Sequence, residues 1–203
     1  MRGLTKALVI GSMMFGFASE GSAKDCQYSV AVDGVSVEWT AYKTSKKAPV
    51  KGTFNTVSLK GKRSAGSLKD LASGLSMEID GTSIESGNPG RNVRVSQFFF
   101  QKFAPSAGIT AKVAKWTGDD QKGTVDISIS LNGKSHTVPM AYTVTEGAFV
   151  AEGAFNMMDF ALKAAFDSLH QACGTLHTGA DGVAKTWEDV GLSLSAKFSK
   201  TCK

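Results

Sequence analysis

One segment in the middle of the chain combines two arginines with three phenylalanines. After the turn-forming run Gly87-Asn88-Pro89-Gly90, the chain continues through Arg91 and Arg94 to Phe98-Phe99-Phe100. Guanidinium groups are planar, permanently charged donors that suit phosphate oxygens, and aromatic rings offer a large apolar area. The residue types therefore indicate a site for an apolar molecule with an anionic head. A surface turn followed by phenylalanines that anchor the core is the simpler alternative.

The rest of the chain is expected to position this segment on β-strands. Apolar and polar residues alternate along 35–42, 124–131 and 192–199, the period typical of strands with one buried face. Asn132-Gly133 is a dipeptide that a tight hairpin turn prefers. Because a sheet that closes on itself removes its edges, we predict a mainly β fold: a single antiparallel β-barrel of about eight strands. A transmembrane barrel would need aromatic belts, which these strands lack, so the apolar faces are expected inside.

One segment near the C-terminal end has a different period. Apolar residues recur there at helical spacing, and they predict one amphipathic helix from about Met157 to Cys173. Asn156 is expected to cap its start and Gly174 its end. Asp159 and Lys163 are expected to pair across one turn. The apolar stripe of this helix would cover the sheet or one end of the barrel.

The N-terminal segment predicts that the protein is exported. Residues 1–23 contain Arg2 and Lys6, an uncharged apolar run from Ala7 to Ala18, and small residues before Lys24, which is the layout of a secretory signal peptide. The apolar run is too short to span a membrane, so the protein is not expected to be membrane-spanning. Residues 24–203 would then form one domain, with a periplasmic or secreted location.

Export would also permit a disulfide. The chain has three cysteines, of which Cys26 opens the mature chain and Cys202 nearly closes it. In a closed antiparallel barrel the first and last strands are neighbours, so we expect a Cys26–Cys202 bridge and a buried Cys173. Pairing of Cys173 with Cys202 is the alternative that the sequence leaves open.

Charge and motif content bear on the class of function. The net charge of +5 is mild, and eight basic residues between Trp39 and Lys69 are unbroken by any acid, which indicates a solvated face or part of an anion-attracting mouth. Few aromatic residues interleave with them, so no nucleic acid is expected as a partner. No nucleophile elbow, apolar carboxylate pair or phosphate loop is present. We therefore predict no enzyme, no catalytic residues, no metal and no cofactor, and we interpret His177 with Asp181 as part of a surface loop.

The arginine-containing segment also resembles the central signature of the YceI-like, lipocalin-like proteins. In that signature an isoleucine and Ser/Thr-Gly-Asn lead to Arg-Asp-x-His-Leu and a Phe-Phe pair. The matching residues are Ile84, Ser86-Gly87-Asn88, Arg91 and Phe98-Phe99, while Asn92 and Arg94 stand where the family commonly has Asp and His. Residues 35–43, 50–54, 132–140 and 153–160 resemble further parts of the family pattern, in the same order.

The resemblance implies a long isoprenoid lipid, such as a polyprenyl phosphate or a quinone, inside the barrel. Each buried methylene contributes about 0.8 kcal/mol, and the head group would meet Arg91 and Arg94. If 98–100 is extended, Phe98 and Phe100 share a side. The candidate ligand-binding residues are Arg91, Arg94, Phe98, Phe100, Trp39, Phe54, Ile127, Ile129, Met140 and Tyr142.

The expected function is therefore to bind, and to transport or store, a polyisoprenoid lipid in a hydrophobic barrel cavity. The alternative is a secreted structural or interaction protein whose barrel is filled by its own side chains, without a lipid ligand. A third reading is a heme-linked quinone handler. The sequence leaves a homodimer open.

Overall fold

The computed structural model describes residues 25–104 and 106–203, so the expected signal peptide, residues 1–23, lies outside the described residues. The described chain is mainly β, and all of its strand pairs are antiparallel. The strands are β1 (Cys26–Lys43), β2 (Ala48–Phe54), β3 (Val57–Gly61), β4 (Ser64–Ala65), β5 (Leu75–Asp80), β6 (Ile84–Glu85), β7 (Gly108–Gly118), β8 (Lys122–Leu131), β9 (Lys134–Thr145), β10 (Ala148–Asn156) and β11 (Asp189–Cys202). The helices are α1 (Leu68–Ser73), η1 (Gly81–Ser83), α2 (Pro89–Phe98), η2 (Phe100–Lys102), η3 (Met157–Phe160), α3 (Lys163–Cys173) and η4 (Gly174–His177), where η marks a 3₁₀ turn.

The sheet curls so that its two ends meet. Its order is β3-β5-β7-β8-β9-β10-β11-β1-β2-β6, with β4 paired to β1. β3 follows β2 after two residues, and β6 follows β5 through η1, so the last strands of the path continue into the first. Hydrogen bonds from Asn55 N to Ser83 O (2.9 Å) and from Asp80 N to Thr56 O (3.1 Å) join these continuations. The predicted fold class is confirmed, and treating β2–β3 and β5–β6 as continuous and leaving out the two-residue β4 gives the expected eight strands.

The β8–β9 hairpin confirms the inward apolar faces that alternation predicted. Val125, Ile127, Ile129 and Leu131 of β8 are at most 6 % exposed, and their neighbours in the strand are more exposed. The turn residues Asn132 and Gly133 have φ of 52° and 70°, the left-handed values that a tight hairpin requires. Apolar side chains thus gather inside the curled sheet in one large cluster.

The predicted helix over 157–173 is wrong in its first part. The chain forms the 3₁₀ turn η3, reverses at Ala161 with φ of 54°, and begins α3 only at Lys163. Phe160 and Leu162 are 0 % and 1 % exposed. Residues two apart lie on different faces of a continuous helix, so the break is what lets both side chains enter the core. The side chain of Asn132 donates to the carbonyls of Phe160 and Ala161 (both 3.2 Å) and holds the break.

The break also changes the predicted ion pair. Asp159 lies outside α3 and approaches His136 (3.8 Å), while Lys163 pairs with Asp167 (2.7 Å). The side chain of Asn156 accepts from Met158 N (2.8 Å), so the predicted cap is confirmed. At Gly174 the chain continues into the 3₁₀ turn η4.

The segment from Pro89 to Phe98 is a helix, so the extended arrangement considered for the phenylalanines is wrong. The side chain of Asn88 accepts from Arg91 N (2.9 Å), and Pro89 occupies the first turn. An asparagine cap followed by proline is a strong helix start. The helix ends at Phe98, and Phe99 leads into η2.

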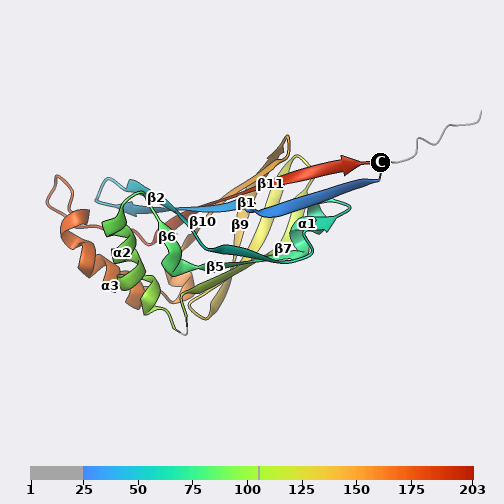
Figure 1. The fold of residues 1–203 in the computed structure, drawn as a ribbon. Helices are drawn as coiled ribbons and strands as arrows, with labels where there is room; N and C mark the ends of the chain where they lie inside the picture. Colours follow the sequence, from blue (N-terminus) through green and yellow to red (C-terminus); the bar gives the residue numbers. More distant parts are fainter. Residues whose placement is uncertain (1–24, 105) are drawn as a thin grey trace, which may run out of the picture.

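The two ends of the barrel differ, as Figure 1 shows. Helices α2 and α3 lie at one end, next to the turn between β1 and β2; we call this the mouth end. α1 and the C-terminus lie at the other, which we call the disulfide end because Cys26 and Cys202 are bonded there. The predicted disulfide is thus confirmed, and Cys173 is free and buried, as expected. In the described part of the chain, no helix has the length and apolar character needed to cross a membrane.

Candidate functional site

The barrel contains an apolar cavity of about 330 Å³ at the mouth end, which we call the main cavity. Apolar residues from β1, β5, β7, β8, β11 and the helices form most of its wall. Binding cavities for small molecules are usually of this size and composition, with a few placed polar groups. The lining includes eight of the residues that the sequence singled out: Trp39, Phe54, Arg91, Arg94, Phe100, Ile127, Ile129 and Met140.

A second cavity of about 110 Å³ lies further along the barrel, beside α1, and we call it the inner cavity. Both cavities are lined by Met77, Ala111, Ile127 and Leu194, which we call the neck. Along β1 the lining runs from Val30 in the inner cavity to Lys43 in the main cavity. At about 3.3 Å per residue, that stretch of strand measures roughly 40 Å. The two cavities together therefore extend along most of β1.

Two of the singled-out residues are outside the lining of both cavities. Tyr142 is 2 % exposed and its ring lies against Trp116 and Phe149, with centroids 4.4 and 5.5 Å away. Its hydroxyl donates to Asp119 O (2.5 Å), and burial raises the pKa of this phenol. Tyr142 thus packs at the turn between β7 and β8. Phe98, the last residue of α2, is half-buried and also outside the lining.

Phe99, and not Phe98 as predicted from the sequence, lines the main cavity. Phe99 and Phe100 are both buried and both line the main cavity. Their rings contact each other and Phe103 at centroid distances of 5.2–5.3 Å. The signal that could have found Phe99 is the Asn88-Pro89 helix start, because it rules out the period of two over 98–100.

Cationic side chains gather where the main cavity reaches the surface. Arg91 and Arg94 extend from α2 and Lys43 from the end of β1, and all three line the cavity. Leu176 also lines it and is 50 % exposed, so this is the mouth. Within residues 25–104 and 106–203, none of these three cations has a carboxylate within 4.0 Å. Their charge is thus available to an anionic group at the mouth.

Asn92 and Arg91 also organise the loop that precedes α2. The Asn92 side chain accepts from Ser86 N (3.0 Å) and from Ser86 Oγ (2.6 Å), and Arg91 Nη1 donates to Ser86 O (3.3 Å). A hydrogen bond from Gly87 N holds the pKa of Glu85 below its ordinary value, and that carboxylate is exposed. These contacts fix the start of α2 and the position of its arginines.

Two histidines share one buried threonine at the mouth. The Nδ1 atoms of His170 and His177 lie 2.8 and 2.7 Å from Oγ1 of Thr186, which is 9 % exposed. Burial, with smaller effects of Lys43 and His170, lowers the pKa of His177. One neutral ring can accept from the hydroxyl while the other donates to it. This arrangement ties α3 and η4 to the chain that enters β11.

The free thiol of Cys173 lies in the same wall. It is 5 % exposed and lines the main cavity. Burial raises the pKa of this thiol, and the nearby Arg94 guanidinium acts in the opposite direction. Among the described residues no group of three or more His, Cys, Asp or Glu side chains gathers as a metal site would require. Asp181, considered with His177 in the sequence, instead accepts from Val183 N (3.1 Å).

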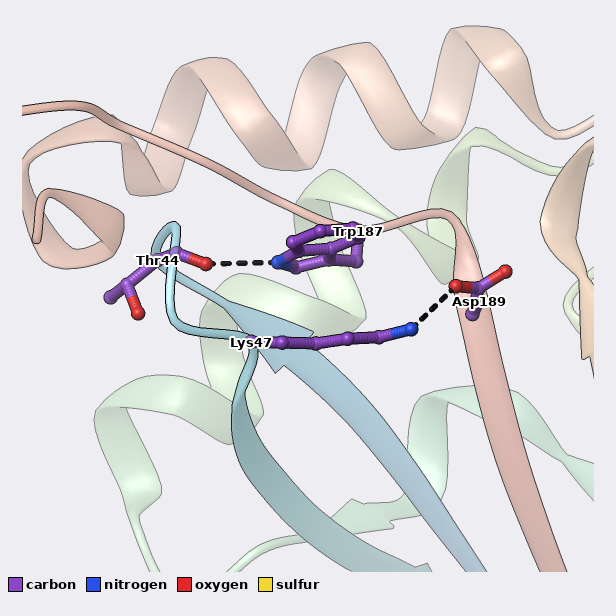
Figure 2. A network of polar contacts seen from close by, with 4 residues as sticks. All are labelled: Thr44, Lys47, Trp187 and Asp189. Carbon is purple, nitrogen blue, oxygen red and sulfur yellow. Dashed lines mark hydrogen bonds and ion pairs between the residues drawn. The ribbon is translucent and has the colours of Figure 1, made fainter.

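Lys47, a lysine of the basic run, joins the turn between β1 and β2 to Asp189 at the start of β11, as Figure 2 shows. Lys47 Nζ lies 2.8 Å from Asp189 Oδ2. The same nitrogen lies over two aromatic rings, 4.9 Å from the centroid of Trp187 and 5.0 Å from the centroid of Tyr42. Trp187 Nε1 donates to Thr44 O (2.9 Å). The turn between β1 and β2 is therefore bound to the segment before β11. Other lysines of the run form exposed pairs, Lys51 with Glu38 and Lys60 with Glu78.

The fold and the cavity define a β-barrel with an apolar interior and cationic side chains at its mouth. A sequence model of the YceI-like domain matches residues 28–198, and the chain belongs to this family. No curated protein gives a significant match.

Two solved structures share the fold. A polyisoprenoid binding domain from Saccharophagus degradans, implicated in plant cell wall breakdown, is 14 % identical with a TM-score of 0.60, over 85 % of this chain and 97 % of that one. BcnA of Burkholderia cenocepacia is 18 % identical with a TM-score of 0.52, over 84 % of this chain and 99 % of that one. At these identities the likeness establishes the fold alone.

Proposed function

We propose that this protein binds a long-chain polyisoprenoid lipid, with its tail in the main and inner cavities and its head group at the mouth. The observation that carries the proposal is an apolar interior that ends beside Arg91, Arg94 and Lys43. The polyisoprenoid binding domain of similar fold supports the same class of ligand. Because each buried methylene contributes about 0.8 kcal/mol, a prenyl tail would bind strongly with little directional chemistry.

Binding, followed by transport or storage, fits the mouth better than catalysis does. The polar groups of the mouth are engaged with one another: His170 and His177 contact Thr186, and Asn92 contacts Ser86. A catalytic acid or base must be placed on the reacting atoms of the ligand, whereas these contacts join the elements of the wall to one another. We also propose that the protein acts in the periplasm or outside the cell, where its disulfide would be stable.

The direct test is identification of the bound lipid. The protein is purified from its native envelope without detergent exchange, and native mass spectrometry and lipid extraction are applied to the same sample. A prenyl lipid at about one per chain is expected. If no prenyl lipid co-purifies and the purified protein also fails to take up prenyl pyrophosphates and alcohols, the proposal fails and a barrel serving as a structural or interaction module is favoured.

The head-group site has its own test. The double variant Arg91→Ala/Arg94→Ala removes two donors from the mouth, and Lys62→Ala/Arg63→Ala removes the same charge from the exposed turn between β3 and β4. Losing a charged hydrogen-bonding partner costs about 1.5–3 kcal/mol, so prenyl pyrophosphate binding should weaken at least about tenfold in the first variant alone. The affinity for the matching prenyl alcohol should stay unchanged. Equal loss for both ligands would remove the head-group role from the arginines.

A further inference from the structure

The exposed large apolar side chains of the described residues all belong to the mouth end. They are Val93 (53 % exposed), Leu176 (50 %) and Val183 (52 %). Val93 is on α2, Leu176 is in η4, and Val183 is in the short hairpin between Thr178 and Ala184. Hydrogen bonds from Gly179 N to Val183 O and from Gly182 N to Gly179 O give this hairpin a defined shape. No such side chain lies at the disulfide end in the described part of the chain.

Basic side chains outnumber acidic ones around the mouth, although the segment that carries Leu176 and Val183 has one lysine and two acids. The three segments that border the mouth are 43–47, 86–98 and 174–188. They contain six basic side chains (Lys43, Lys46, Lys47, Arg91, Arg94 and Lys185) and two acidic ones (Asp181 and Glu188). Lys47 is paired with Asp189, which leaves five cations. Asp181 is engaged with the side chain of Ser45 and the N–H of Val183, and these bonds hold the pKa of its carboxyl below the ordinary value.

We propose that the mouth end docks on the surface of an anionic lipid bilayer, with Val93, Leu176 and Val183 in the headgroup region. Basic residues near a bilayer are attracted to anionic lipids, and apolar side chains among them enter the interface. The docking surface is defined by these three residues with Lys46 and Lys185. The role of this docking rests on the proposed function: a lipid could pass from the bilayer into the main cavity without crossing water.

A bilayer fits this surface better than a protein partner does. The apolar side chains are few and stand on three separate elements around an opening. A stable protein interface usually buries about 800 Å² on each partner and has a packed apolar centre. Docking on a fluid lipid surface instead requires only basic residues around the opening and a few exposed apolar side chains. The disulfide end, which has no such apolar residue among those that the structure describes, provides the internal reference.

The experiment is co-sedimentation of the mature protein with phosphatidylcholine vesicles, prepared with and without phosphatidylglycerol. Two variants remove the surface without altering the cavity lining: Val93→Ser/Val183→Ser and Lys46→Glu/Lys185→Glu. Lys62→Glu/Arg63→Glu at the disulfide end is the matched control for charge reversal. We expect binding to phosphatidylglycerol vesicles by the parent and the control, and a loss of at least about tenfold in each of the two mouth variants.

Other outcomes would overturn the proposal. Equal binding by the parent and both mouth variants, or loss in the control alone, would exclude docking through this end. Absence of vesicle binding together with a dimer that Val93→Ser/Val183→Ser dissociates would assign the surface to a second copy of the chain. Prenyl alcohol binding is measured in parallel in detergent. If it fails while vesicle docking persists, the proposed function is wrong and the docking surface stands.

Discussion

The mouth end and the disulfide end belong to one curled sheet, but the disulfide end is closed by packed side chains and the mouth end is open. At the disulfide end β1 and β11 stay paired to the last residues, with Cys26 opposite Cys202. Leu68 and Leu71 of α1 pack there with Tyr28 in a separate small cluster, each at most 6 % exposed. At the mouth end, by contrast, the helices α2 and α3 lie beside the turn between β1 and β2 (Figure 1). There, helical segments carry exposed apolar and basic side chains next to the main cavity.

The comparison shows how one barrel can be both stable and open. Closing an end requires apolar side chains that contact one another, and α1 supplies them. At an open end, the polar groups that are partly buried in the wall need hydrogen-bond partners within the protein, while water satisfies the exposed ones. At the mouth, Lys47 and Trp187 do this through their contacts with Asp189 and Thr44 (Figure 2). The histidine pair does it through Thr186. Substitutions in the packed disulfide end are thus expected to affect stability more than substitutions on the exposed rim of the mouth, on which ligand access depends.

The largest difference should come from introducing the same charge at each end. Leu71→Asp places an unpaired carboxylate in the small cluster under α1, where Leu71 is 3 % exposed. A buried, unpaired charge costs about 3–5 kcal/mol of unfolding free energy. Val183→Asp, on a side chain 52 % exposed, should change it by about 0.5 kcal/mol or less. Urea unfolding followed by circular dichroism measures both, and equal losses would show that the small cluster tolerates a charge as well as the rim of the mouth does.

The disulfide should have the next largest effect. Cys26 and Cys202 are 176 residues apart in sequence, so the bond restricts a very large loop in the unfolded chain. Replacing both cysteines by serine is expected to lower the unfolding free energy by about 2–5 kcal/mol. Reductant added to the parent should shift its urea midpoint to that of the double variant. An unchanged midpoint in either experiment would show that the pairing of β1 with β11 is sufficient by itself.

Within the mouth end, the wall should be far less tolerant than the rim. A Cβ added at Gly52 would lie 2.3 Å from the Trp39 ring and 2.5 Å from Glu85 O, whereas at Gly90 the nearest atom is 3.5 Å away. Gly52→Ala should therefore cost about 1–3 kcal/mol through overpacking. Gly90→Ala, in α2, should be neutral or gain up to about 1 kcal/mol. Thermal unfolding of the two variants measures these changes. A neutral Gly52→Ala would mean that the atoms around Gly52 can shift to accept the added methyl group.

The neck should decide whether a ligand tail can extend from one end toward the other. Ala111→Phe adds a ring where the main and inner cavities meet. If the tail passes the neck, the affinity for a long prenyl alcohol such as solanesol should fall at least about tenfold, while that for geraniol stays the same. Thr110→Phe, on the exposed side of the same strand, is the control. Fluorescence titration in detergent measures the affinities, and a parallel loss for both alcohols would argue against a connected interior.

The smallest effect concerns pH at the mouth. Because the pKa of His177 is lowered in the folded protein, the unfolded chain binds the proton first as the pH falls through the ordinary value near 6.5. Stability from the neutral ring is thus complete above that pH and is lost as the pH falls below it. Between about pH 7.5 and about pH 5.5, the melting temperature of the parent should fall about 1–2 °C more than that of His177→Gln. His136→Gln serves as the control, and identical falls in parent and His177→Gln would contradict the assignment.

Local sequence signals predicted the parts of the fold that depend on local rules. The alternation in β8 and the turn at Asn132 and Gly133 required only neighbouring residues, and both are present. The disulfide followed from the barrel topology once the first and last strands were taken as neighbours. The start of α2 was not predicted, because Asn88 and Pro89 were interpreted as part of a turn, although they are also a helix cap and first turn. The phenylalanines that follow were instead assigned the period of a strand.

The parts that could not be predicted depend on contacts between distant residues. The break after Phe160 relies on Asn132, 28 and 29 residues from the two carbonyls that it binds. The neck brings together four residues from different strands, and the mouth combines α2, α3 and the turn between β1 and β2. Arg91 and Arg94 were singled out by residue type, and Lys43 could not be distinguished from the other lysines of its run without its position.

The location of Cys173 provides a built-in reporter of occupancy. Of the three cysteines in the chain two are bonded to each other, so the native protein has a single thiol to modify, and it faces the main cavity. Alkylation by a slim apolar maleimide would therefore proceed only as fast as the interior is vacated. The rate of mass gain would time the release of a guest molecule without any engineered label.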